Sequence, residues 1–320
     1  MRILSGIQPS GVLHIGNYFG MMRPAIELQR EGETFYFIAD YHALTSVRDP
    51  KALRENSRRV ALDFLACGLD PERSALFRQS DVPQVTELAW ILSTVAPMGL
   101  LERAHSYKDK LARGLPPTVG LFSYPVLMAA DILIYDSDVV PVGKDQKQHI
   151  EITRDLAGKI NDTFGHVFKL PEARIQTATE VVPGIDGQKM SKSYGNNIDI
   201  FGNENETRKR VMSIVTDSTP VEASKDAARS TIFQLYSLIA SKEEISDMRE
   251  RFENGGTGYG EFKKELFAKL WAYFAPMRQC RQEILRDKAY IDQVLTRGAE
   301  RANEVADRVI QRVRSAVGLR

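Results

Sequence analysis

Short apolar runs alternate with helical patterns through the first 200 residues of the chain. Four runs have the length and apolar character of buried strands, at residues 3–7, 34–39, 75–79 and 139–142. Between them, apolar residues recur every three or four positions, most clearly at 51–66 and 84–95, as amphipathic helices require. Strands that alternate with helices are parallel, because each helix carries the chain back across the sheet. We therefore predict an α/β fold with a Rossmann-like, doubly wound parallel sheet.

The strand signal disappears after about residue 200, and the pattern becomes helical. Four further helical patterns follow, at residues 230–240, 242–252, 259–274 and 299–317. In the last of these, Ala302, Val305, Val309 and Val313 fall on one helix face. The C-terminal part is therefore predicted to be an all-helical domain.

The change of pattern gives a prediction of two domains, at residues 1–200 and 201–320. A length of 320 residues also exceeds the usual size of a single domain. Within the first domain, the charge-rich segment at about 99–125, which contains Pro116 and Pro117, interrupts the alternation of strands and helices. We predict that it is an insertion between the two halves of the sheet.

Composition narrows the class of protein. Hydrophobic residues make up 43% of the chain and charged residues 27%, as in ordinary globular proteins, and no apolar run is long enough to cross a bilayer. Met1 leads directly into strand-like sequence rather than a secretory signal, so we expect a cytoplasmic protein without a membrane partner. Cys67 and Cys280 are far apart in the sequence and lack metal-ligand spacing, so no structural metal is predicted. With a net charge of +1, any RNA binding would depend on a local patch.

The stretch GIQPSGVLHIGN, residues 6–17, runs from a strand through a turn into a helix. The N–H groups and dipole at such a helix start attract anions. His14 and Asn17, three residues apart, would share a helix face, and Gly16 would let a flat ring or a ribose approach the backbone. The alternative is that Ser10 only caps the helix and His14 is a surface residue.

The sequence KMSKS at residues 189–193 lies in a polar, glycine-rich stretch that we predict to be a loop at 186–197. Lys189 and Lys192, flanked by hydroxyls, suit a polyphosphate whose negative charge grows in the transition state. By itself this pattern also fits a solvated, charged loop.

The two stretches together resemble the HIGH and KMSKS signatures of class I aminoacyl-tRNA synthetases. Longer stretches resemble the bacterial tryptophanyl-tRNA synthetase family specifically: SGIQPSG at 5–11, LMAADILIYDSDVVPVGKDQKQHIEITRDLA at 127–157, PEARI at 171–175 and VTDS at 215–218. The resemblance covers essentially the whole chain, and its central block is long enough to be specific.

This resemblance implies that the enzyme activates L-tryptophan with ATP and Mg²⁺, releases pyrophosphate, and transfers the tryptophanyl group to the 3′-terminal ribose of tRNA(Trp). It also implies a homodimer and an anticodon-binding role for the helical domain. His14, Lys189 and Lys192 would be the catalytic residues. The family's ATP contacts map to Gln8, Pro9, Ser10, Gly16, Asn17, Gly143, Lys144, Asp145, Val182, Lys189, Met190, Ser191, Lys192 and Ser193.

The same resemblance assigns a tryptophan site. Asp131 would accept the indole N–H, which can only donate a hydrogen bond. Gln146 and His42 would bind the amino and carboxylate ends of the substrate. The apolar walls would come from Leu4, Gly6, Met128, Val140 and Val142. The alternative for Asp131, a lone carboxylate within an apolar run, is a helix-surface residue that faces solvent.

Some positions depart from the family pattern, and some alternatives stay open. Leu4 stands where many relatives have Phe, and Lys144 where many have Glu; the assignment of Val182 to adenine rests on weak similarity. The basic cluster at 207–210 could contact RNA or could simply be a solvated helix start. The rival functions are tyrosine activation, adenylyl transfer by a small relative of the same superfamily, and a non-catalytic paralogue that binds RNA or protein as an auxiliary factor.

Overall fold

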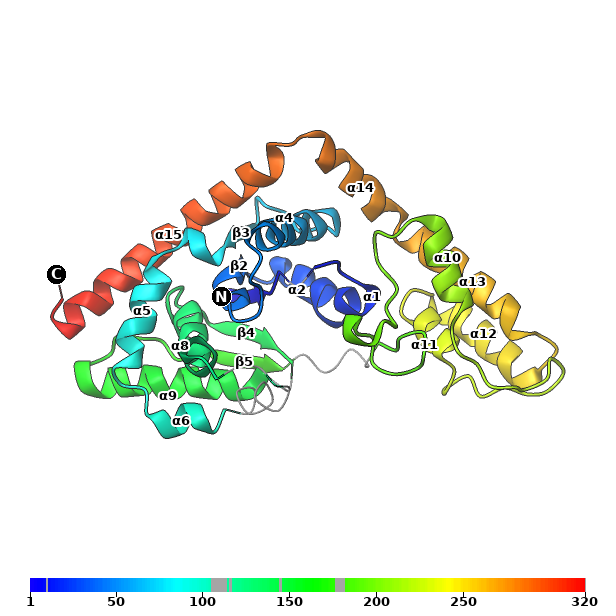
Figure 1. Cartoon of the computed structure of the whole chain (residues 1–320), viewed down its shortest axis with the longest axis horizontal. Coiled ribbons are helices and arrows are strands. Elements are labelled where there is room, and N and C mark those ends of the chain that lie inside the picture. The colour runs from blue at the N-terminus through cyan, green and yellow to red at the C-terminus, as the bar shows by residue number, and fades with distance from the viewer. Residues whose placement is uncertain (10, 105–113, 115–116, 144–145, 176–181, 320) are drawn as a thin grey trace.

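The structure is a computed structural model that describes residues 1–9, 11–104, 114, 117–143, 146–175 and 182–319 (Figure 1). At its centre, five parallel strands form a sheet in the order β3-β2-β1-β4-β5. The strands are β1 (Arg2–Ile7), β2 (Glu33–Ile38), β3 (Ser74–Arg78), β4 (Val139–Val142) and β5 (Glu172–Ile175). The predicted α/β class is confirmed. The edge strand β5, with the sequence EARI, was not predicted, because its four residues hold no apolar run.

Helices cover both faces of the sheet. On one face lie α1 (Ile15–Asn17), η1 (Tyr18–Met22), α2 (Arg23–Glu27) and α4 (Pro50–Ala66), and on the other α5 (Gln84–Ser93) and α8 (Val119–Leu133). Side chains of the strands alternate between these layers: Tyr36 and Ile38 of β2 join the first core, whereas Phe35 and Phe37 join the second. The sheet is therefore doubly wound, as the alternation of strands and helices predicted.

Shorter elements and one long helix complete this α/β body. They are η2 (Leu28–Arg30), α3 (Asp40–Ala43), η3 (Gln79–Asp81), α6 (Met98–Glu102), α9 (Lys147–Phe164) and η5 (Lys192–Tyr194). Helix α9 lies beside β5 and packs against α8 (Figure 1). Of the segment predicted to be an insertion, at 99–125, residues 105–113 and 115–116 lie outside the described residues; the rest includes most of α6 and the first half of α8. In the described part of the chain, no helix is both long and apolar enough to cross a membrane.

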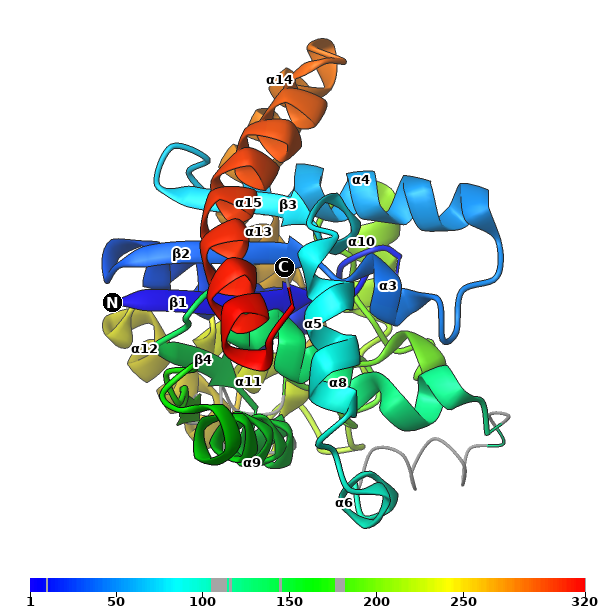
Figure 2. The same cartoon turned by 90° about the vertical axis from the view of Figure 1, so that its left-hand side faces the viewer.

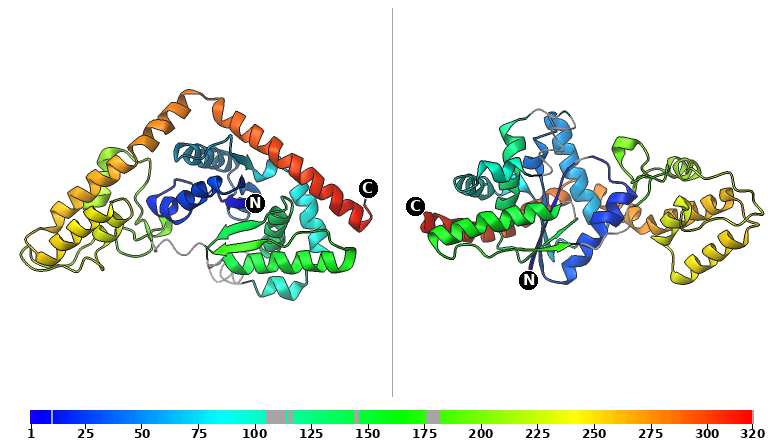
Figure 3. Two further views of the ribbon diagram at one scale, coloured as in Figure 1. Left: turned by 180° about the vertical axis from the view of Figure 1, so that it is seen from behind. Right: turned by 90° about the horizontal axis from the view of Figure 1, so that it is seen from below.

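A second group of helices forms a body beside the sheet, seen at the right of Figure 1 and of the right-hand view of Figure 3. It contains α10 (Glu204–Met212), α11 (Thr231–Ser237), α12 (Lys242–Asn254) and α13 (Tyr259–Tyr273). Met248, Phe252, Phe262 and Leu266 are buried at its centre. Ser241 and Glu244 form a reciprocal capping box that fixes the start of α12.

The last two helices, α14 (Ala275–Arg286) and α15 (Tyr290–Val317), lead from the helical body back over the sheet (Figures 1 and 2). Helix α14 packs along α4, where Arg281 Nε lies 2.8 Å from the buried Asp63 Oδ1. Helix α15 packs on β3, and its apolar stripe joins the core of the α/β body. Although α15 belongs to the segment 201–320, its stripe thus completes an apolar face of the sheet that α5 and α8 leave open.

An aromatic cluster joins the two bodies. Tyr18 and Phe19 of η1 contact Tyr273 and Phe274, which lie where α13 meets α14, with ring centroids 5.1–6.2 Å apart. The two tyrosine hydroxyls are also 3.3 Å apart, within hydrogen-bond distance. One continuous apolar cluster therefore extends from the sheet into the helical body.

Helix α15 depends on the absence of a side chain at Gly298, which leads to a stability prediction. A Cβ at this position would overlap the backbone carbonyl of Leu76 in β3, and backbone cannot rotate aside as a side chain can. We expect Gly298→Ala to lower the free energy of unfolding by about 3 kcal/mol, measured by urea denaturation. Gly158→Ala in α9 is the matched control, because no atom of the described residues lies within 4 Å of its Cβ position. The control should stabilise the protein by about 0.5–1 kcal/mol. Equal effects of the two changes would contradict this account.

Candidate active site

A cavity of about 460 Å³ lies at the carboxyl ends of the central strands. Strand order reverses between β1 and β4, and at such a switch point an open α/β sheet binds its ligands. The cavity is lined by Leu4, Ser5, Gly6, Gln8, Met21, Phe37, Ala39, His42, Tyr124, Met128, Asp131, Ile132, Val140, Pro141, Val142, Gly143, Gln146 and His149. All eight residues expected to form an amino-acid site are in this set.

Among the described residues of this lining, Asp131 is the acidic one, and it is 1% exposed. Its Oδ1 accepts a hydrogen bond of 2.7 Å from Gln79 Nε2, and its Oδ2 lies 2.8 Å from His42 Nε2. Burial raises the pKa of the Asp131 carboxyl, and the two hydrogen bonds act in the opposite direction. The structure thus decides against the alternative of a solvent-facing aspartate. His42 contacts this carboxylate directly, a contact that the sequence did not predict.

Several lining residues were not predicted, although the sequence carried a signal for some of them. Tyr124 and Ile132 recur with the predicted Met128 and Asp131 at the spacing of one helix face, and all four line the cavity from α8. Counting back one and two helical turns from Asp131 would have identified this face from the sequence. The sequence could not have identified Phe37 as a lining residue, because its ring reaches the cavity beneath Gly6, where a Cβ on the glycine would lie 2.5 Å from the ring.

His14 and Asn17 bond to each other rather than only sharing a face. His14 is the N-cap of α1, and its Nδ1 accepts a hydrogen bond of 3.3 Å from the Asn17 N–H. In return, the Asn17 Oδ1 accepts one of 3.2 Å from the His14 N–H. The prediction put His14 and Asn17 on one helix face; the helix begins only at Ile15, because this reciprocal cap fixes its start.

The same contact determines the tautomer of His14. Because Nδ1 accepts from a backbone N–H, a neutral ring carries its proton on Nε2. Burial, with the Lys192 ammonium as a second cause, lowers the pKa of His14 to about 4. His14 is therefore neutral at pH 7 and offers a hydrogen-bond donor, not a charge.

The loop that carries KMSKS is folded back on itself by Asn196, which is 2% exposed. The Nδ2 of Asn196 donates hydrogen bonds to Asp186 Oδ1, at 2.7 Å, and to the Lys189 carbonyl, at 3.2 Å. Its Oδ1 accepts a hydrogen bond of 2.8 Å from the Ser191 N–H. Arg210 of α10 donates to the carbonyls of Gly195 and Asn197 beyond it. One buried amide and one guanidinium thus hold the two ends of the loop together.

Backbone pairing brings the two motifs together. The Ile15 N–H donates a hydrogen bond of 2.9 Å to the Ile198 carbonyl, and the Ile200 N–H donates one of 3.3 Å to the Leu13 carbonyl. A Cβ on Gly16 would lie 3.1 Å from Met190 Cβ, so this glycine admits the KMSKS loop itself. The segment that bears His14 is therefore joined by a short antiparallel bridge, between His14 and Asp199, to the chain that directly follows the KMSKS loop.

The other residues predicted to bind ATP from this loop include an exposed set and a buried set. Lys189, Lys192 and Ser193 are exposed, whereas Met190 and Val182 are buried beneath them. Desolvation by neighbouring protein atoms lowers the pKa of Lys192, although Asp199 acts in the opposite direction. The lysine ammonium groups thus lie on the open side of the loop, where an anion can reach them.

Comparisons with known proteins agree with this arrangement. Residues 1–275 match the family described as tRNA synthetases class I (W and Y). The chain belongs to this family. Tryptophan–tRNA ligase of Rhodopirellula baltica is 54% identical over 320 residues, which are 100% of both chains. The crystal structure of tryptophanyl-tRNA synthetase from Campylobacter jejuni, complexed with ADP and tryptophan, is 50% identical, with a TM-score of 0.94 over 100% of both chains.

A more distant member shares the fold alone. The tyrosyl-tRNA synthetase of Archaeoglobus fulgidus, complexed with L-tyrosine, is 20% identical, with a TM-score of 0.68 over 88% of this chain and 90% of that one. The resemblance to class I synthetases predicted from HIGN and KMSKS is confirmed. Of the family's expected nucleotide contacts, Ser10, Lys144 and Asp145 lie outside the described residues.

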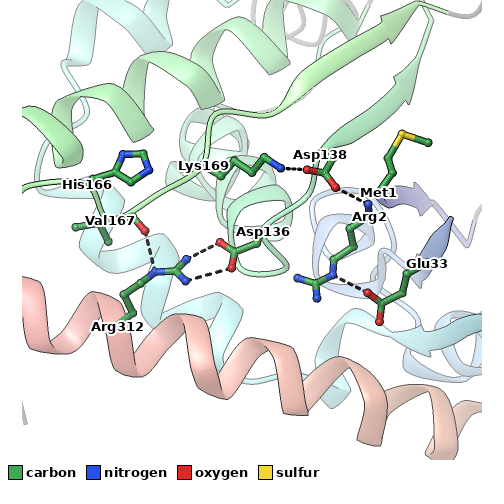
Figure 4. A pocket seen from close by; sticks show the side chains of 9 residues that line it. All are labelled: Met1, Arg2, Glu33, Asp136, Asp138, His166, Val167, Lys169 and Arg312. Carbon is green, nitrogen blue, oxygen red and sulfur yellow. Dashed lines mark hydrogen bonds and ion pairs between the residues drawn. The ribbon is translucent and has the colours of Figure 1, made fainter.

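A second cavity, of about 500 Å³, lies at the opposite, amino-terminal edge of the sheet (Figure 4). Its charged groups pair with one another: Arg312 of α15 donates to Asp136 at 2.5 and 3.2 Å, and Lys169 pairs with Asp138. None of the predicted site residues that the structure describes lines it. The Arg312–Asp136 pair joins α15 to the loop before β4, and Arg312 Nε also donates a hydrogen bond of 2.8 Å to the Val167 carbonyl in the loop before β5. The charged groups of this cavity thus help to dock α15 against the sheet.

The lowered pKa of His14 predicts how stability changes with pH. Between pH 6.5 and about 4, the unfolded chain binds a proton at His14 that the folded chain does not bind, so the free energy of unfolding falls as the pH is lowered. At pH 5 the loss from this residue should be about 2 kcal/mol relative to pH 7.

Urea denaturation of the wild type and His14→Gln at both pH values measures this loss. The difference between the two pH values should shrink in His14→Gln and stay unchanged in His166→Gln, which removes an exposed imidazole. The same pH dependence in all three proteins would count against a buried, neutral His14.

Proposed function

We propose that this chain joins L-tryptophan to tRNA(Trp) in two steps. First, a carboxylate oxygen of tryptophan attacks the α-phosphorus of ATP, which gives tryptophanyl-adenylate and pyrophosphate. Then the 3′-terminal ribose hydroxyl of tRNA(Trp) attacks the activated carbonyl, and AMP leaves. Membership of the family and 54% identity to a tryptophan–tRNA ligase over the whole chain support this function.

The buried Asp131 carboxylate in the cavity wall is the observation that carries the choice of amino acid. An indole N–H needs an acceptor, and a carboxylate with one hydrogen bond on each oxygen keeps further lone pairs for it. The rest of the indole ring would meet the apolar side chains of Met128, Val140 and Val142. Gln146, in the same lining, would reach the polar end of the substrate.

We assign the ATP phosphates to the space between the HIGN and KMSKS segments. A neutral His14 would donate from Nε2 to a phosphate oxygen, and Lys189 and Lys192 would neutralise the charge that develops on the leaving pyrophosphate. The remaining nucleotide contacts in this proposal are Gln8, Pro9, Gly16, Asn17, Gly143, Val182, Met190, Ser191 and Ser193. The relative from C. jejuni holds ADP and tryptophan together, which supports adjacent sites.

No general base is needed in the first step, because the attacking carboxylate is already a nucleophile. The chain contributes orientation and electrostatic stabilisation instead. Mg²⁺ would arrive with ATP, as part of the substrate complex. Among the residues that the structure describes, no group of three or more His, Cys, Asp or Glu side chains is placed to hold a metal ion.

Anticodon recognition is assigned to the body formed by α10 to α13, as the resemblance implies. Its densest basic cluster, at 207–210, is partly committed to the fold. Arg208 stacks over Phe267 at 4.7 Å from the ring centroid, and Arg210 holds the KMSKS loop. Only Lys209 of this cluster remains as an exposed basic residue without such a structural role among the contacts described. We expect RNA contacts to be spread over the body rather than centred on this cluster.

We also propose that the protein is a homodimer. The support comes from exposed apolar side chains on three helices, α5, α6 and α8, which lie between β3 and β4 in the sequence. Trp90 of α5 is 72% exposed, Met98 of α6 63% and Val119 of α8 81%. Large side chains this exposed favour burial against a second copy. Because charging of tRNA serves protein synthesis, we place the enzyme in the cytoplasm.

Amino-acid-dependent exchange of labelled pyrophosphate into ATP tests the first step, followed by charging of tRNA(Trp). Each of the twenty amino acids would be assayed with the purified protein and Mg²⁺. We expect exchange with tryptophan alone. Exchange with tyrosine would keep the fold and overturn the role of Asp131, and no exchange at all would favour the auxiliary-factor alternative.

Lys192→Ala should lower the rate of tryptophan activation roughly 100-fold or more, the usual loss when a transition-state contact is removed. The KM for tryptophan should change little, because Lys192 lies on the loop and outside the lining of the cavity. Pre-steady-state formation of the adenylate measures both quantities. Lys159→Ala on α9 controls for the loss of an exposed lysine, and equal rates in the two variants would refute the assignment.

Trp90→Glu should convert the dimer into a monomer, measured by analytical ultracentrifugation. The added charge would oppose burial at an apolar contact. Leu285→Glu is the matched control. This leucine is 50% exposed and belongs to α14, which lies apart from α5 (Figure 1), so the change should leave the dimer intact. A wild-type protein that sediments as a monomer would exclude the dimer outright.

A further inference from the structure

We propose that Gln79 is a positioning residue for amino-acid selection: it holds Asp131 in the direction that lets the carboxylate read a hydrogen-bond donor on the substrate. The inference rests on the proposed function, because it assumes that Asp131 faces the side chain of the amino acid. Gln79 itself is absent from the lining of the cavity, so it would act only through Asp131.

The geometry of Gln79 is that of a fixed link. It follows directly after β3, at the start of η3, and is 1% exposed. Its Nε2 donates a hydrogen bond of 2.7 Å to Asp131 Oδ1, and its Oε1 accepts one of 3.1 Å from the Tyr41 N–H. Both bonds are between groups separated by 38 or more residues, so they join three elements, η3, α3 and α8.

The amide of Gln79 can occupy only one orientation. A backbone N–H is always a donor, so the atom facing Tyr41 must be the carbonyl oxygen, and the NH₂ group must face Asp131. This removes the ambiguity between the oxygen and nitrogen of a side-chain amide. Gln79 therefore presents a donor to Oδ1, which is the interaction that favours an ionised carboxylate.

Asp40 fixes the two loops that carry this link. It accepts hydrogen bonds from the Ser80 N–H at 3.0 Å, the Ser80 hydroxyl at 2.5 Å and the Tyr41 N–H at 3.0 Å. Ser80 follows Gln79, and Tyr41 supplies the donor to it. The carboxyl ends of β2 and β3 are thus joined behind the cavity, so the amide of Gln79 has little freedom to move away from Asp131.

The consequence is a carboxylate held on both oxygens, with Gln79 on Oδ1 and His42 on Oδ2. Each oxygen keeps a second lone-pair direction, and these directions are fixed once the carboxylate plane is fixed. A site built around such a buried contact discriminates strongly against a substrate that lacks the matching donor. Without Gln79, Asp131 would keep only its His42 contact and could rotate.

The test compares tryptophan with 3-(benzothiophen-3-yl)alanine, in which sulfur replaces the indole N–H. Pyrophosphate exchange gives kcat/KM for each substrate, and the ratio of the two values measures recognition of the N–H. We expect Gln79→Met, which keeps the shape and removes both polar atoms, to lower this ratio roughly 10-fold, as for the loss of one hydrogen bond to a charged group. Gln79→Glu, nearly identical in size, should lower it as well, because it turns a donor toward Asp131 into an acceptor.

Gln29→Met is the matched control. The side-chain amide of Gln29 also links two segments: it accepts a hydrogen bond of 2.9 Å from the Asp70 N–H and donates one of 3.1 Å to the Gly68 carbonyl. It lies, however, at the opposite end of β3. Its loss should reduce stability and leave the substrate ratio at the wild-type value.

The outcomes separate the inference from the proposed function. A lower ratio in either folded Gln79 variant, with the KM for ATP unchanged, supports a positioning role. Equal losses for both substrates would show that Gln79 acts only on the fold, which would overturn the inference. If the wild type itself does not activate tryptophan, the proposed function fails instead.

Discussion

The reversal of strand order between β1 and β4 is the constraint on which the candidate site depends. Hydrogen bonding pairs β1 with β2 on one side and with β4 on the other, and the chain leaves the two central strands in opposite directions. The crevice between their carboxyl ends is therefore left open by the crossover helices. The cavity that contains Asp131 lies in this crevice, and the segment that contains His14 starts from the same strand end. Both parts of the proposed chemistry follow from one feature of the sheet.

The site has an enclosed part, which contains buried Asp131 and His14, and an exposed part, which contains the lysines of the KMSKS loop. Around Asp131, burial makes a charge costly, and the interactions with His42 and Gln79 oppose the rise of its pKa. Around His14, burial removes the charge and leaves a neutral donor. The formal positive charges are carried instead by the lysines of an exposed loop. Such a division suits a ligand with an aromatic side chain at one end and phosphates at the other, because each end meets the environment that it needs.

The helical body is tied to the sheet at three places that are far apart in the sequence. The aromatic rings of Tyr18 and Phe274 pack at the centre of the molecule, Arg210 binds the KMSKS loop, and α14 and α15 return along α4 and β3. Tyr18 follows directly after the HIGN motif. The element next to the candidate catalytic histidine is thus also the element on which the helical body rests, so the positions of the two bodies and of both motifs are set together.

The sequence by itself determined the period of its elements and the chemistry of its motifs. Its apolar runs located β1 to β4 and most helices, and its two short motifs indicated the family before any contact was known. It did not reveal β5, which has no apolar run, or α14, none of whose residues is buried. Only the tertiary structure decided that α15 covers the sheet, that His14 caps its helix and that Gln79 supports Asp131. Periodicity reports which face of an element is buried, whereas the partner that buries it is chosen by packing between residues far apart in the chain.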